Sequence, residues 1–193
     1  MTTAPSDTKP QITPATTAGP PLRRLYLVRF AFAIVWAALF ALTSSPFGTA
    51  ALALAVLYPV FDVAAAVTDA RSASAGSRST VALYVNMAVS AAAAIALAVV
   101  GTGDVGDVLL VWGAWAIAAG AVQLAVGIQR RAQPGHYPMI FSGALSIVAG
   151  TSFVASAHDA TSLAAVAGYA VLGGVFFLVS ALRLGRREAV QRP

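Results

Sequence analysis

Six long apolar blocks, separated by short polar segments, constrain the fold of this chain more than any other feature of its sequence. Each block has about the ~20 residues that an α-helix needs to cross a hydrocarbon core ~30 Å thick. Helices of this length in water-soluble proteins carry a polar face, which these blocks lack. The sequence therefore predicts an all-α membrane protein of six transmembrane helices, at Leu25–Thr43, Ala50–Thr68, Val81–Val100, Val108–Ile128, Pro138–Ala157 and Ser162–Leu182.

The amino-acid composition also indicates a membrane protein. Apolar residues make up 59% of the chain and charged residues 10%, against roughly 25% charged residues in soluble domains. A lipid bilayer is therefore the expected partner. The net charge of +5 comes without aromatic residues interleaved among the basic ones, so no nucleic-acid partner is expected. With no cysteine and two histidines, the sequence predicts neither a metal site nor a cofactor.

The basic residues gather on alternate connections between the apolar blocks. The first, third and fifth connections, at 44–48, 101–107 and 158–161, contain no Lys or Arg. By the positive-inside rule the basic side is cytoplasmic, which predicts a multi-pass protein of the cytoplasmic (inner) membrane with both termini in the cytoplasm. That side holds every basic residue except Arg29, namely Lys9, Arg23, Arg24, Arg71, Arg78, Arg130, Arg131, Arg183, Arg186, Arg187 and Arg192.

The chain divides into two tails and one membrane domain. Residues 1–21 are rich in Thr, Pro, Ala and Ser, a composition that predicts a disordered cytoplasmic tail. The membrane domain is predicted to cover 22–187, and 188–193 to form a second, short cytoplasmic tail. Within the domain we expect three α-helical hairpins, at 22–71, 79–131 and 136–187.

The three hairpins align with one another as a degenerate internal repeat. The alignment brings three aromatic residues to one position of the second helices and three polar residues to one position of the first helices. The aromatic set is Tyr58, Trp115 and Tyr169, and the polar set is Arg29, Asn86 and Ser142.

Glycines recur every seven residues in the fourth block, at Gly113, Gly120 and Gly127. Residues with this spacing share one face of a helix, and small residues on a shared face let membrane helices approach closely. The sequence therefore predicts that this helix packs tightly against a neighbour.

Three segments carry a resemblance to a known family. They are WGAWAIAAGAVQ at 112–123, FSGALSIVAG at 141–150 and GYAVLGG at 168–174. With the three hairpins ending in basic residues, they resemble the HdeD-type short-repeat membrane proteins, linked in enterobacteria to acid resistance. The resemblance covers about residues 22–187. It is weakest in the first hairpin, where Val63 stands at a position usually held by glycine. The resemblance implies a six-helix inner-membrane fold and a role in acid or envelope stress, and it brings no catalytic residues.

Arg29 and Asp62 are the ionisable residues that lie well inside the predicted spans. At ~1.5 Å per residue, Arg29 lies roughly 6 Å and Asp62 roughly 9 Å from the cytoplasmic edge, so we expect them to meet across the first hairpin. One interpretation is a structural ion pair, with Arg29 extending toward the surface. The other is a proton-linked or anion-binding site that faces a cytoplasmic cavity.

Other polar and aromatic residues inside the spans are candidates for either packing or binding. The amides of Asn86 and Gln123 are expected to hydrogen-bond to neighbouring helices. Tyr58, Trp115 and Tyr169 are candidates to line a pocket for an apolar ligand. Trp112 fits either that pocket or a belt of aromatic residues at the membrane interface.

The sequence contains no recognisable enzyme motif, neither a P-loop nor a Gly-x-Ser-x-Gly, Gly-x-Gly-x-x-Gly or His-Glu-x-x-His pattern. We therefore expect a non-enzymatic protein of the inner membrane, acting in stress by itself, as a homo-oligomer or with another membrane protein. Two alternatives stay open. One is a small proton-linked transporter or channel. The other is a membrane-embedded enzyme that uses Asp62 on a lipid or isoprenoid, which predicts a cavity shared by Asp62, Tyr58 and Trp115.

Overall fold

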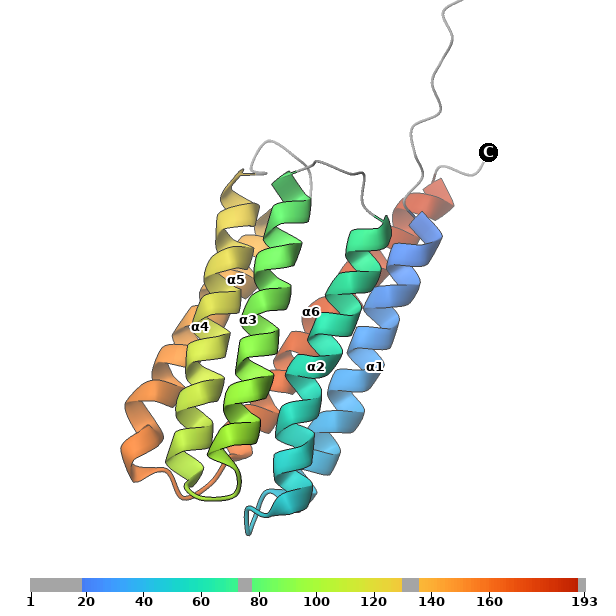
Figure 1. The fold of residues 1–193 in the computed structure, drawn as a ribbon. Helices are drawn as coiled ribbons and strands as arrows, with labels where there is room; N and C mark the ends of the chain where they lie inside the picture. Colours follow the sequence, from blue (N-terminus) through green and yellow to red (C-terminus); the bar gives the residue numbers. More distant parts are fainter. Residues whose placement is uncertain (1–18, 73–77, 130–135, 191–193) are drawn as a thin grey trace, which may run out of the picture.

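The computed structural model describes residues 19–72, 78–129 and 136–190, and within them it contains six long α-helices and no strand (Figure 1). The prediction of an all-α protein with six helices is confirmed. A short 3-10 helix, η1, covers Ala157–Asp159. The long helices are α1 (Gly19–Thr43), α2 (Thr49–Ser72), α3 (Arg78–Val100), α4 (Val105–Gln129), α5 (His136–Ser156) and α6 (Ala164–Val190).

All six long helices are longer than the apolar blocks that predicted them. Helix α1 begins at Gly19, inside the segment predicted to be a tail, and α6 continues to Val190. Apolarity marks the part of a helix that crosses the hydrocarbon core, whereas the backbone hydrogen bonds of a helix continue equally well into a polar interface. Residues 1–18 and 191–193 of the two predicted tails lie outside the described residues.

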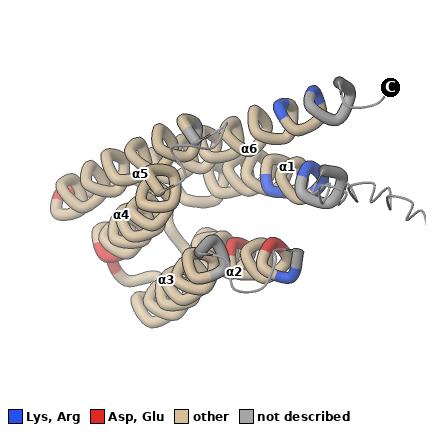
Figure 2. The backbone as a smooth tube through the Cα atoms, turned by 90° about the horizontal axis from the view of Figure 1, so that it is seen from above, with Lys and Arg blue, Asp and Glu red and all other residues tan. Residues whose placement is uncertain are grey.

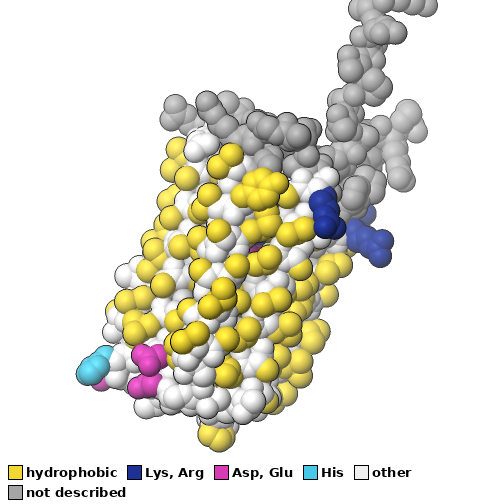
Figure 3. All heavy atoms as spheres, viewed as in Figure 1, with side chains coloured by type: hydrophobic (Ala, Val, Ile, Leu, Met, Phe, Trp, Pro, Cys, Tyr) yellow, Lys and Arg dark blue, Asp and Glu magenta, His cyan; other side chains and the backbone are white. Residues whose placement is uncertain are grey.

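Large apolar side chains cover the outside of the bundle. Leu42 and Val99, for example, are 80% and 81% exposed, and apolar groups spread over the whole visible side between the two ends (Figure 3). Continuous apolar surface of this extent is unfavourable in water and suited to lipid. All six long helices also have the length and hydropathy of membrane spans. The chain is an integral, multi-pass membrane protein.

The six helices pack as three close pairs, α1 with α6, α2 with α3, and α4 with α5 (Figure 2). Each pair joins the second helix of one predicted hairpin to the first helix of the next, in cyclic order. Packing within the hairpins is looser, and it is loosest between α5 and α6. The sequence repeat itself stays a prediction, although the cyclic pairing gives the three hairpins corresponding places in the bundle.

Helices α4 and α5 approach most closely, and glycines line their contact. A Cβ atom added to Gly150 would lie 2.6 Å from the carbonyl oxygen of Gly113. A Cβ atom added to Gly120 would lie 2.8 Å from the carbonyl oxygen of Gly143, and one added to Gly143 would lie 2.8 Å from the carbonyl oxygen of Gly120. The seven-residue glycine spacing on α4 therefore marks a real packing face, and Gly106 extends it by one more step.

The two ends of the bundle carry different charges. Helix α1 begins and α6 ends at the same end (Figure 1), where Arg side chains lie, while Asp and His side chains gather at the opposite end (Figure 3). At that opposite end the Asp104 carboxylate accepts a hydrogen bond from the Gly106 backbone N–H, 2.7 Å away. Asp104 thereby caps the N-terminus of α4.

Candidate functional site: a buried polar cluster at Asp62

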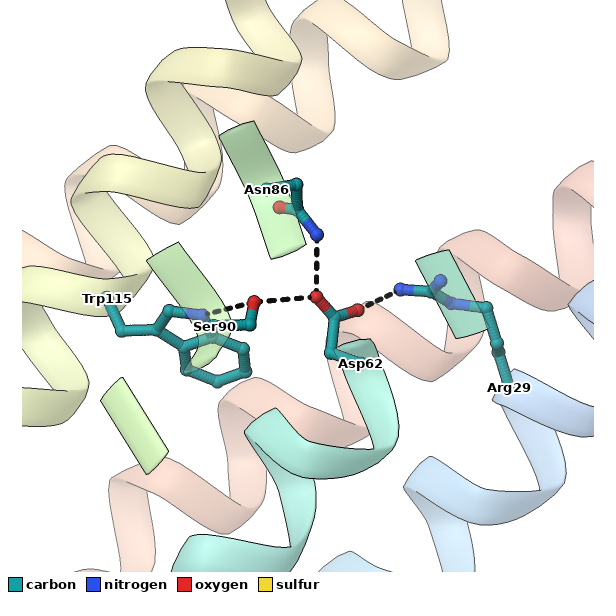
Figure 4. Close-up of polar contacts among 5 residues, drawn as sticks. All are labelled: Arg29, Asp62, Asn86, Ser90 and Trp115. Carbon is teal, nitrogen blue, oxygen red and sulfur yellow. Dashed lines mark hydrogen bonds and ion pairs between the residues drawn. The ribbon is translucent and has the colours of Figure 1, made fainter. Parts of the chain in front are cut away.

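A polar cluster centred on Asp62 lies between the helices of the first and second hairpins (Figure 4). Asp62 is buried on α2 and pairs with the guanidinium of Arg29 on α1. Its other carboxylate oxygen accepts hydrogen bonds from Asn86 Nδ2 at 2.7 Å and from Ser90 Oγ at 2.9 Å, both on α3. An ionised carboxylate accepts about four hydrogen bonds, so three donors occupy most of its capacity.

Arg29 reaches Asp62 from a position where its guanidinium also contacts α6. The Arg29 Cζ atom lies 4.4 Å from the centre of the Phe177 ring, a cation–π geometry. Its Nε atom is buried and has no hydrogen-bond partner. The side chain is 17% exposed, compared with 10% for Asp62. Arg29 therefore connects α1, α2 and α6 and lies mostly within the protein.

The cluster extends to α4 through Ser90 and Trp115. The indole Nε1 of Trp115 donates a hydrogen bond to Ser90 Oγ at 3.0 Å, and the Ser90 hydroxyl in turn donates to Asp62 (Figure 4). A single chain of polar contacts thus runs from α4 through α3 and α2 to α1. Because neutral indole only donates, the chain ends at Trp115 with a group that accepts no proton.

Aromatic rings fill the interior next to this cluster. Tyr58 lies 5.5 Å from Trp112 and 5.8 Å from Trp115, measured between ring centres, and the two indoles lie 5.0 Å apart. Trp36 of α1 joins them at 4.7 Å from Tyr58 and donates a hydrogen bond to the Leu54 carbonyl oxygen. Trp112 is 0% exposed, which places it in the interior and excludes the interfacial belt. Its indole N–H is buried among rings without a hydrogen-bond partner.

A small cavity of about 30 Å³ lies between α5 and α6, the two helices of the most loosely packed hairpin. This is about the volume of one water molecule, far below the ~300–1,000 Å³ of typical ligand sites. Of the predicted pocket residues, Tyr169 lines it, whereas Tyr58 and Trp115 lie in the aromatic packing described above. The lining does not include Asp62, and consists of Ser142, Leu145, Ser146, Tyr169, Leu172, Gly173 and Phe176.

Three of the four predicted polar residues come together in the structure, and the fourth does not. Arg29, Asp62 and Asn86 meet in the cluster, as the first and second hairpins adjoin there. Gln123, half-buried on α4, is not among the donors to Asp62. Sequence reasoning missed Ser90, although it stands four residues after Asn86 and so shares its helix face. It also missed Phe177, since nothing in the sequence pairs a ring on α6 with an arginine on α1.

One hydrogen bond within the second hairpin recurs at the corresponding positions of the third hairpin. Trp115 donates to Ser90, and Tyr169 donates to Ser146 at 3.0 Å. The two donors stand at one position of the predicted repeat, and the two serines also correspond because each follows its hairpin's aligned polar residue by four. The corresponding position in the first hairpin is Ala33, which has no hydroxyl.

No protein-family model, curated protein or solved structure matches this chain. In the part of the chain that the structure describes, no three His, Cys, Asp or Glu side chains come together as metal ligands. The candidate site is therefore defined by its own geometry, as a buried carboxylate held by one guanidinium, one amide and one hydroxyl.

Proposed function

We propose that this chain is a non-enzymatic protein of the cytoplasmic membrane that contributes to acid or envelope stress tolerance, by itself or with a partner. The observation that carries the non-enzymatic part is the burial of Asp62 and its engagement by three donors. A general base must reach the proton that it removes from a substrate, and Asp62 instead faces Arg29, Asn86 and Ser90. The cluster acts as a structural connection between helices.

The stress role and the orientation rest on the sequence. The resemblance of residues 22–187 to HdeD-type proteins supports the stress role. The position of the described Arg side chains toward the end where α1 begins and α6 ends supports an arrangement in which both termini are cytoplasmic. The end with His158 and Asp159 then faces the outside, where acid shock first acts.

A deletion strain tests the stress role. We expect it to survive acid shock less well than its parent, and a plasmid copy of the gene to restore survival. The double variant Arg29→Met/Asp62→Leu tests the structural role of the ion pair in the same strain. Since apolar residues of similar volume can replace a buried ion pair at little cost in stability, this variant should restore survival as well as the wild-type gene. A correctly inserted double variant that fails to restore it would instead assign chemistry to the charges.

A proton-linked transporter or channel is the second candidate, favoured by a carboxylate and a guanidinium buried inside the spans. Purified protein in liposomes with an internal pH dye tests it. Proton flux above that of empty liposomes, abolished by Asp62→Asn, would support transport. Flux equal to that of empty liposomes would leave the non-enzymatic structural role as the better account.

A further inference from the structure

One face of α6 changes from apolar to basic along its length. Val175, Val179 and Leu182 are exposed, and their spacing of four and three residues places them on one side of the helix. Arg183 and Arg186 follow on the same side and are also exposed. The apolar block of α6 ends at Leu182 in the sequence, directly before Arg183, so the two guanidinium groups are placed where the hydrocarbon core meets the lipid headgroups.

Helix α1 brings further positive charge to the same level. Arg23 lies against α6 at Gly185, where an added Cβ atom would be 3.0 Å from the Arg23 Nε. The apolar block of α1 begins at Leu25, directly after Arg23 and Arg24, and both arginines are exposed. The close packing of α1 with α6 therefore concentrates basic side chains at one corner of the bundle, visible at the ends of these two helices in Figure 2.

We propose that this corner binds an anionic phospholipid, with its phosphate at Arg183 and Arg186 and one acyl chain along Val175, Val179 and Leu182. Guanidinium groups match phosphate oxygens in bidentate geometry, and basic sites at the ends of membrane helices bind anionic headgroups. The proposal is independent of the stress role. It also goes beyond membrane topology, since the positive-inside rule predicts on which side the arginines lie but not that a lipid stays bound after purification.

The end of α2 provides an internal comparison. Arg71 is exposed there, at the same end of the bundle, but α2 contains no second arginine. A single guanidinium gives a weaker positive potential than the pair Arg183 and Arg186, which weakens attraction for a phosphate. Arg71 is therefore the matched control for Arg186, with the same charge on a different helix.

Native mass spectrometry of the full-length protein tests the proposal, with phosphatidylglycerol and phosphatidylcholine of identical acyl chains as probes. We expect one phosphatidylglycerol to remain bound, with an affinity at least tenfold above that for phosphatidylcholine and decreasing with salt. Equal affinity for the two lipids would overturn the proposal. So would displacement of the lipid by millimolar inorganic phosphate, which would indicate a site for the free anion.

Single substitutions then locate the site. Arg186→Gln should weaken phosphatidylglycerol binding about fivefold, equivalent to the ~1 kcal/mol of one basic residue at an anionic surface. Arg71→Gln should leave the affinity within twofold of wild type, and Arg186→Lys should retain most of it. Equal losses from Arg186→Gln and Arg71→Gln would show nonspecific attraction and contradict a defined site. If Arg186→Gln does not insert, the lipid comparison on the wild-type protein still decides the matter.

Discussion

Two regions of this molecule hold helices together in different ways. Helices α4 and α5 meet through glycines, whose missing side chains let backbones approach until an added Cβ atom would collide. Helices α1, α2 and α3 instead meet around Asp62, through an ion pair and two hydrogen bonds from side chains. Lipid provides no hydrophobic drive between helices, so contact of backbones and bonding of polar groups are the available sources of association. This chain uses one in each region.

The difference matters for how each region responds to mutation. Glycine packing is lost when atoms are added, whereas the polar cluster is lost when atoms are removed. A buried charge is also more sensitive to the loss of its partner than to the loss of the whole pair, because an unpaired charge in an apolar surrounding is costly.

The largest effect is expected from Asp62→Ala. It leaves the Arg29 guanidinium inside the bundle without its carboxylate, and breaking a buried pair in this way costs about 3–5 kcal/mol. Unfolding in SDS titrations of the detergent-solubilised protein, followed by tryptophan fluorescence, measures the loss. The control Arg29→Met/Asp62→Leu removes both charges and should recover most of the stability. A double variant as unstable as Asp62→Ala would mean that the pair itself holds the first hairpin.

The glycine face is tested by Gly150→Ala. The new Cβ atom would lie 2.6 Å from the Gly113 carbonyl oxygen and 2.9 Å from the Ile117 backbone nitrogen, so α4 and α5 must separate. We expect a loss of about 1–3 kcal/mol, typical of overpacking. Gly168→Ala is the matched control, because open space surrounds Gly168. In the same SDS titration it should be neutral or stabilising by up to about 1 kcal/mol. Equal effects at the two glycines would contradict close packing as the cause.

The fold was predictable to a greater extent than the site. Apolar block length alone predicts six helices, since a bilayer imposes one span length on every helix. The glycine period of seven in turn predicts one tight interface. The sequence could not show which helices pair most closely, because packing between α1 and α6 depends on contacts more than a hundred residues apart in the chain.

The site was predictable where its residues were unusual in a membrane. Arg29, Asp62 and Asn86 stood out because charge and amide are costly in lipid, and all three meet in the structure. Ser90 did not stand out, since serine is common in membrane helices and usually bonds to its own backbone. Gln123 has the same chemistry as Asn86, yet only position in the bundle decides which amide reaches the carboxylate.

A smaller loss of stability is expected when these two amides are replaced one at a time. Asn86→Leu removes a 2.7 Å hydrogen bond to a carboxylate, for an expected loss of about 1.5–3 kcal/mol. Gln123 does not bond to Asp62, and leucine has a similar size. Gln123→Leu should therefore change the free energy of unfolding by no more than about 0.5 kcal/mol. Thermal unfolding of the two variants in the same detergent makes the comparison. Equal losses would show that amides in this bundle act through packing and not through the cluster.

The smallest effect concerns the two corresponding serines. Ser146→Ala removes only the acceptor of the Tyr169 hydroxyl beside a cavity that can admit water, so the loss should be about 0.6 kcal/mol, the average for such bonds in membranes. Ser90→Ala removes both a donor to a charged carboxylate and the acceptor of Trp115. It should therefore cost two to three times as much as Ser146→Ala, because hydrogen bonds to charged groups are stronger than those between neutral groups. A double-mutant cycle of each serine with its aromatic partner, Trp115→Phe or Tyr169→Phe, measures the coupling. If Ser146 and Ser90 proved equally costly, Asp62 would contribute nothing through Ser90, and the polar cluster would end at Asn86 on α3 without extending to α4.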